Sequence, residues 1–161
     1  MEWNEKHAEI FSEIISRFKH KNIKYFILRN YEGLPNLNSS KDVDIVVDPN
    51  KSVEAINIVK SVYKDKGLKN YHEVKFGQVT CCHGIDTSLK IGIHIDIISS
   101  YISKGYELFS FEYLYSFTEN YNEFCVLNRY MEGVMVFIYK QFNYKNPRLK
   151  PIYCDIIYHT Y

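Results

Sequence analysis

Two aspartates stand two positions apart at the start of an apolar run. In the stretch KDVDIVVD, Asp42 and Asp44 alternate with Val43, Ile45 and Val47. On a β-strand, residues i and i+2 project from one face, so both carboxylates point together while the valines and the isoleucine face the core. Carboxylates this close repel each other unless a cation lies between them. The pair therefore predicts a site for a hard divalent cation, Mg²⁺ or Mn²⁺, at the start of a buried strand.

A third aspartate can complete this site from a neighbouring strand. The stretch LKIGIHIDIIS (89–99) alternates isoleucines with polar positions, and Asp96 is the one acid in it. Such a trio of carboxylates on adjacent strands is suited to metal-dependent phosphoryl transfer, with metal bound by Asp42, Asp44 and Asp96. We expect Asp96 to act also as general base, because it comes from outside the paired motif. His94 stands beside it on the same face and is expected to hydrogen-bond an acid.

These strands need a scaffold, and the hydrophobic patterns predict an α+β fold. The sheet is expected to be mixed, with helices packed on one face and a helical C-terminal tail. We expect one domain, with an α/β core over 1–100 and a mostly helical part over 101–161. The predicted helices cover 3–20, about 50–66, 108–117, 129–142 and a short segment after Pro151, and the predicted strands cover 23–30, 43–47, 71–76, 78–83, 89–99 and 124–128.

Charge and hydropathy limit the possible partners. The formal net charge of the 161 residues is +1, which argues against binding to nucleic acid or to an anionic membrane surface. The longest apolar stretches are too short to span a bilayer, so no membrane insertion is expected. The N-terminus carries acids and lacks the basic start of a secretory signal, which predicts a cytoplasmic protein. The oligomeric state stays open.

The cysteines do not form a recognisable ligand pattern. Cys81 and Cys82 are adjacent and would face opposite sides of a strand, so the stretch CCH ending at His83 lacks a second paired cluster to complete a zinc site. We expect free, partly buried thiols.

The order of these segments resembles the nucleotidyltransferase superfamily of the DNA polymerase beta type. The resemblance covers about residues 3–100 and rests on a helix, a strand, a loop, the motif KDVDIVVD and the later IHIDII. The stretch FILRNYEGLPNLNSSKDVDIVVD also looks like a group of nucleotidyltransferase-like proteins encoded with bacterial surface-polysaccharide genes. The resemblance implies an NTP substrate and a small-molecule acceptor, with Asp42, Asp44 and Asp96 as the matching acids.

One departure from the superfamily pattern concerns the phosphate contacts. Where the superfamily has Gly-Ser at the end of the first strand, this chain has Arg29 and Asn30. Arg29 is expected either to bind phosphate or to form an ion pair with one of the aspartates. Asn30, Ser39 and Ser40 are expected to supply hydrogen bonds to the nucleotide. By the resemblance Lys140 reaches the phosphates, although a surface lysine with a packed aliphatic stem is the alternative.

Three functions follow from these observations. The first is a metal-dependent nucleotidyltransferase that moves a nucleoside monophosphate from NTP to a small acceptor, such as a sugar or polysaccharide precursor. The second is a catalytically degenerate relative that binds a nucleotide or a protein partner, which the missing Gly-Ser pair favours. The third is an antibiotic nucleotidyltransferase of the lincosamide or aminoglycoside kind.

Overall fold

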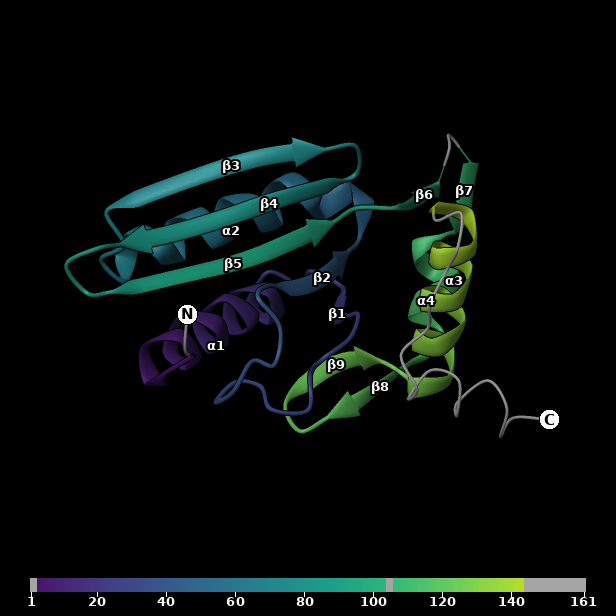
Figure 1. Ribbon diagram of the computed structural model, residues 1–161, viewed down its shortest axis with the longest axis horizontal. Coiled ribbons are helices and arrows are strands. Elements are labelled where there is room, and N and C mark those ends of the chain that lie inside the picture. The colour runs from purple at the N-terminus through teal and green to yellow at the C-terminus, as the bar shows by residue number, and fades with distance from the viewer. Residues whose placement is uncertain (1–2, 104–105, 144–161) are drawn as a thin grey trace.

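The computed structural model describes residues 3–103 and 106–143 of the chain, and these residues form helices around one large sheet (Figure 1). The helices are α1 (Glu5–His20), the short 3-10 helix η1 (Pro49–Lys51), α2 (Ser52–Asp65), α3 (Phe111–Tyr115) and α4 (Arg129–Asn143). The strands are β1 (Tyr25–Ile27), β2 (Val43–Val47), β3 (Asn70–Phe76), β4 (Val79–Asp86), β5 (Ile91–Ile98), β6 (Tyr101–Ser103), β7 (Tyr106–Phe109), β8 (Thr118–Tyr121) and β9 (Phe124–Leu127).

The large sheet has seven strands in the order β3-β4-β5-β2-β1-β9-β8. Strand β2 pairs in parallel with β5, β1 pairs in parallel with β9, and the other pairs are antiparallel. The sheet is therefore mixed and the fold is α+β, as predicted. A crossover through α2 and the β3–β4 hairpin separates β2 from β5 along the chain and returns β5 to its side.

Helices α1 and α2 cover one face of this sheet. Their apolar positions, such as Phe11 and Val59, pack on the odd-numbered residues of β2 and β5 in one continuous core. At the start of α1, the side chain of Asn4 accepts hydrogen bonds from the helix N-terminus. Asp48 follows β2 and caps η1, because its side chain accepts a hydrogen bond from the backbone N–H of Asn50.

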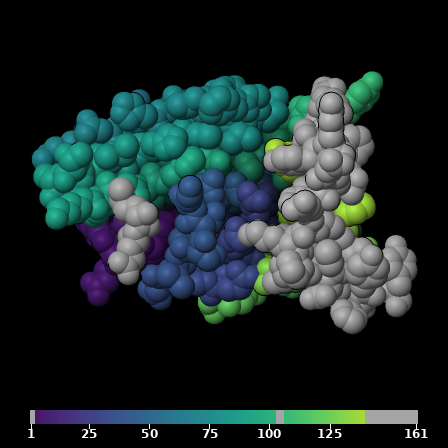
Figure 2. Space-filling view, viewed as in Figure 1, coloured from purple at the N-terminus to yellow at the C-terminus, as the bar shows by residue number. Residues whose placement is uncertain are grey.

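The opposite face is covered at one end only. A second cluster there joins Val46 of β2 and Ile98 of β5 to Phe111 of α3 and to Met131 and Met135 of α4. Helices α1 and α2 thus share one face, as predicted, while α3 and α4 of the C-terminal part pack on the other. Figure 2 shows the teal atoms of the β3–β5 region at the surface of this face, where none of the described helices lies over them.

The part that follows β5 differs most from the prediction. Strands β6, β7 and β8 were not predicted, and the segment expected to be helical over 108–117 is the end of β7 followed by α3. Strands β8 and β9 join the main sheet beside β1. The helix expected after Pro151 lies outside the described residues. Among the described helices, none combines the length and the apolar character required to cross a membrane.

Candidate functional site

Three aspartate side chains meet on the face of the sheet that α1 and α2 do not cover. Asp44 and Asp96 are register partners on the parallel strands β2 and β5, and Asp42 directly precedes β2. One carboxylate oxygen from each of the three residues lies within 4.8 Å of the others. The donor set is all oxygen and negatively charged, which fits a Mg²⁺ or Mn²⁺ ion. The convergence expected from the sequence is present in the structure.

Asp44 is the buried member of the trio. Only 7% of the residue is exposed, and burial raises the pKa of its carboxyl group above the ordinary value. Arg29 opposes this shift, because its Nε donates a hydrogen bond to Asp44 Oδ2 at 2.7 Å. The neighbouring charges of Asp42 and Asp96 raise the pKa further. The charge of Arg29 thus offsets part of the cost of burying this carboxylate among other acids.

Arg29 follows β1 and is held beside β2 by the backbone. The backbone N–H of Leu28 donates to Asp44 O at 3.0 Å, which extends the β1–β2 pairing to the residue before Arg29. Of the two roles expected for Arg29, the structure shows the ion pair with an aspartate. Asn30 comes next in a left-handed backbone conformation with φ of 57°.

The loop before β2 positions Asp42. Ser40 Oγ donates to Asp42 Oδ1 at 2.8 Å, and the Asn38 side chain bonds both Ser40 N and Asp42 O. Ser40 therefore holds an acid of the trio, whereas Ser39 is exposed. Lys140 lies within α4, and its side chain is outside the described part of the structure.

Asp96 accepts hydrogen bonds from two other side chains. His94 Nε2 lies 2.7 Å from Asp96 Oδ1, as expected for a residue that hydrogen-bonds an acid. Cys81 of β4, the register partner of Asp96, also donates to the carboxylate. Burial would raise the pKa of Asp96, but these hydrogen bonds outweigh it and the pKa lies below the ordinary value. The hydrogen bond to Asp96 raises the pKa of His94, and burial together with Asp96 raises the pKa of the Cys81 thiol to about 12.

A pocket of about 250 Å³ opens over the trio. Its floor is the sheet, and its walls come from the segment after β5 and from α4. Burial raises the pKa of the Tyr101 hydroxyl in this wall, so the group is a neutral hydrogen-bond donor at physiological pH. The lining residues are Leu28, Arg29, Asp42, Asp44, Val79, Asp96, Ile98, Ser100, Tyr101, Ile102 and Tyr139.

Two features of the site were not found from the sequence. Tyr101 lines the pocket from β6, a strand that the sequence did not predict. Cys81 faces Asp96 only because β4 and β5 pair in that register. The alternation of the CCH stretch indicates that Cys81 and His83 share one face of their strand. It does not show that Cys81 lies opposite Asp96, because that depends on the register between β4 and β5.

Neither a protein-family model nor a curated protein matches this sequence. Among solved structures, the chain is similar to terminal uridylyl transferase 4 from Trypanosoma brucei with bound GTP, at 13% identity and a TM-score of 0.33 over 65% of this chain and 33% of that one. The same transferase with bound CTP gives 11% identity and a TM-score of 0.31, over 57% and 31% of the two chains. The chain thus matches about a third of the length of those structures. Since both TM-scores are low, we base the function on the site itself.

Proposed function

We propose that this protein is a metal-dependent nucleotidyltransferase that moves a nucleoside monophosphate from NTP to a small acceptor. The observation that supports it is the convergence of Asp42, Asp44 and Asp96 within 4.8 Å at the floor of a pocket. An acidic site of this kind would repel a triphosphate unless divalent cations neutralised both. When bound, Mg²⁺ or Mn²⁺ would supply charge neutralisation for the phosphates and for the leaving group.

In the proposed reaction, an acceptor hydroxyl oxygen attacks the α-phosphorus of the NTP. A new P–O bond forms, the bond to the β-phosphate oxygen breaks, and pyrophosphate leaves with the electron pair. Asp96 accepts the hydroxyl proton, since hydrogen bonds from His94 and Cys81 keep this carboxylate ionised and oriented. Asp42 and Asp44 would hold the cation that binds the nucleotide phosphates. Lys140, Asn30 and Ser39 remain proposed phosphate contacts.

The acceptor is proposed on chemical grounds. The pocket wall presents hydroxyl groups of Ser100 and Tyr101, which can hydrogen-bond a polyhydroxylated molecule such as a sugar or polysaccharide precursor. We place the reaction in the cytoplasm, where NTP is available. An antibiotic acceptor would undergo the same reaction, so only a turnover measurement can distinguish an antibiotic acceptor from a sugar acceptor.

The ion pair between Arg29 and Asp44 favours a second candidate. Arg29 already supplies a positive charge to Asp44 Oδ2, in place of the Gly-Ser backbone seen in the resembling superfamily. A protein with this arrangement could bind a nucleotide or a protein partner without turnover. The second candidate predicts nucleotide binding that needs no divalent cation, with Arg29 as a direct phosphate ligand.

A thermal-shift experiment tests the binding step. Each NTP is added to the wild type with Mg²⁺, with Mn²⁺ and with EDTA, and we expect stabilisation that requires the metal. Asp44→Asn should abolish this shift, whereas Asp65→Asn, a change at an exposed acid at the end of α2, should retain it. Stabilisation in EDTA supports the second candidate. No stabilisation by any NTP overturns the transferase and the nucleotide-binding form of the second candidate.

Turnover distinguishes an enzyme from a nucleotide-binding protein. NTP labelled at the α-phosphate is incubated with Mg²⁺ and a panel of sugars, sugar phosphates and aminoglycoside or lincosamide antibiotics. Transfer of label to one class identifies the acceptor. Binding without transfer to any member of the panel contradicts the proposed reaction.

A further inference from the structure

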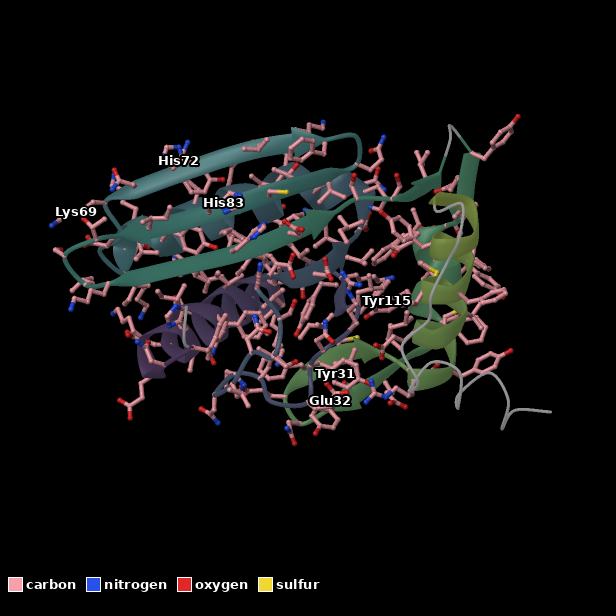
Figure 3. The ribbon with its side chains drawn as sticks, viewed as in Figure 1. Tyr31, Glu32, Lys69, His72, His83 and Tyr115 are labelled. Atoms are coloured by element: carbon pink, nitrogen blue, oxygen red, sulfur yellow. The ribbon has the colours of Figure 1, made fainter. Side chains whose placement is uncertain are left out.

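Strands β4 and β5 place a second set of metal-ligand side chains next to the acidic trio. In their antiparallel register, Cys81 lies opposite Asp96 and His83 lies opposite His94. The row continues on β3, where His72 is the register partner of His83, and Figure 3 labels both of these histidines on the neighbouring strands. Sulfur and nitrogen donors therefore stand on the same sheet face as the carboxylates.

Three of these side chains already converge. The ligand atoms of Cys81, His94 and Asp96 lie within 4.8 Å of one another. The edge of a tetrahedral zinc site measures about 3.3–3.8 Å, given metal–ligand bonds of about 2.0–2.3 Å. A bound metal would draw the three ligand atoms together by side-chain rotation, since the backbones that carry them are held in paired strands.

The hydrogen bonds in this cluster indicate where a cation would lie. His94 Nε2 lies 2.7 Å from Asp96 Oδ1, and Cys81 is the register partner of Asp96 on the neighbouring strand. A divalent cation at that position would bind the thiolate sulfur, Nε2 of a neutral imidazole that carries its proton on Nδ1, and a carboxylate oxygen, and the thiol proton would pass to solvent.

The donor types distinguish this set from the acidic trio. Carboxylate oxygens alone select hard cations, whereas a thiolate with an imidazole selects Zn²⁺ and similar thiophilic metals. We propose that Cys81, His94 and Asp96 form a binding site for a thiophilic divalent cation, with water in the fourth position. The site requires no nucleotide, and so it goes beyond the proposed function.

The surroundings allow a metal to enter. Cys81, His94 and Asp96 are each half-buried, and they face the side of the sheet where the β3–β5 region reaches the surface. The ring of His83 packs on that of His94 with centroids 4.0 Å apart, which restricts the orientation of the imidazole. A restricted imidazole beside a fixed carboxylate favours metal binding, because less conformational freedom is lost.

Cobalt absorption spectroscopy tests this proposal directly. Metal-free, reduced protein is titrated with Co²⁺, which replaces Zn²⁺ and reports thiolate ligands through a near-ultraviolet charge-transfer band. We expect this band together with the visible spectrum of a tetrahedral site, and Zn²⁺ should displace the cobalt. Cys81→Ser should lose the charge-transfer band, and His94→Gln should weaken cobalt binding more than about tenfold.

Two variants serve as controls. Cys125→Ser removes a half-buried free thiol on β9 and should keep the band. Asp42→Asn changes only the oxygen trio and should keep it as well, so failure of the proposed transferase does not affect this result. Circular dichroism establishes that each variant is folded. A wild type without the band, or a folded Cys81→Ser variant that retains it, overturns the proposal.

Discussion

Arg29 and Asp44 form an ion pair at the edge of the pocket, with 2.7 Å between Nε and Oδ2. The arginine side chain is 40% exposed while that of the aspartate is 10% exposed, so the carboxylate is desolvated and the guanidinium is only partly so. Arg29 thereby balances part of the negative charge that Asp42, Asp44 and Asp96 bring together. This pair links the stability of the fold to the chemistry of the site.

Replacing Arg29 should destabilise the protein and increase its response to metal. We expect Arg29→Gln to lower the free energy of unfolding by about 1–2 kcal/mol, less than the loss for a wholly buried pair because Arg29 is partly solvated. Millimolar Mg²⁺ should raise the melting temperature more in this variant than in the wild type, since the competing positive charge is gone. Thermal denaturation in EDTA and in Mg²⁺ measures both effects.

Arg17→Gln is the matched control for this experiment. Arg17 also bonds carboxylates, those of Glu13 and Asp65, but it lies on α1 away from the trio. Its replacement should leave the response to Mg²⁺ equal to that of the wild type. An equal response in Arg29→Gln would contradict the role given to Arg29.

Asp42→Asn should separate stability from metal binding. The charge of Asp42 raises the pKa of Asp44, so removing it relieves repulsion, and asparagine keeps an acceptor for Ser40 Oγ. In EDTA we expect the free energy of unfolding to be unchanged or higher by up to about 1 kcal/mol. The stabilisation by Mg²⁺ should disappear. Urea denaturation with and without the metal tests this combination.

Asp48→Asn controls for the loss of one carboxylate near the same strand. Asparagine caps a helix as well as aspartate does, so the η1 cap is retained and the response to Mg²⁺ should persist. If Asp42→Asn proved much less stable than the wild type in EDTA, the carboxylates would not be in mutual repulsion.

His7 should make the protein sensitive to mild acid. The residue is 1% exposed, and burial lowers the pKa of its imidazole below the ordinary value of 6.5. The unfolded chain therefore binds a proton more readily than the folded one around this pH. Its contribution to stability is complete above about pH 6.5 and is lost as the pH falls below it, by up to about 1.4 kcal/mol per pH unit.

His7→Gln should flatten this part of the stability profile. Free energies of unfolding measured from pH 8 to about pH 5 give the slope in each variant. His20→Gln, which removes an exposed histidine from the end of the same helix, should keep the wild-type slope. Equal slopes in His7→Gln and in the wild type would show that His7 is protonated alike in both states.

Gly84 should not tolerate a side chain. A Cβ atom there would lie 2.6 Å from Leu68 Cδ1 and 2.7 Å from the ring of Tyr63, which packs α2 against β4. We expect Gly84→Ala to cost about 1–3 kcal/mol through overpacking. Combining it with Leu68→Ala should cost less than the sum of the two single changes, because part of the clash is removed. If the losses in free energy of unfolding, measured by urea denaturation, were strictly additive, the strain in Gly84→Ala would not arise from contact with Leu68.

The parts of the fold that the sequence predicted well have strong hydrophobic periodicity. The buried positions of helix α1 recur every three to four residues, and those of strand β5 recur at every second residue over most of its length. The type and the buried face of each element could therefore be predicted. The strands β6, β7 and β8 have only three or four residues each, and β7 and β8 carry exposed glutamates, so their pairing partners and not their own pattern make them strands.

The acidic site could be predicted because the apolar residues at every second position of both strands show which face packs on the core. Once Val43 and Ile95 are assigned to the buried face, Asp44 and Asp96 must share the other. The partner of Arg29 was harder to predict, because its long side chain can reach either a bound phosphate or one of the aspartates. Cys81 and Tyr101 could not be placed, because their positions depend on strand registers that a single sequence does not specify.

The crossover between β2 and β5 has a consequence for biosynthesis. As a nascent chain leaves the ribosome, Asp42 and Asp44 emerge well before Asp96, and the strand that carries the last acid arrives after α2 and the hairpin. A growing polypeptide therefore carries an incomplete pocket, and the three carboxylates come together only in the finished sheet.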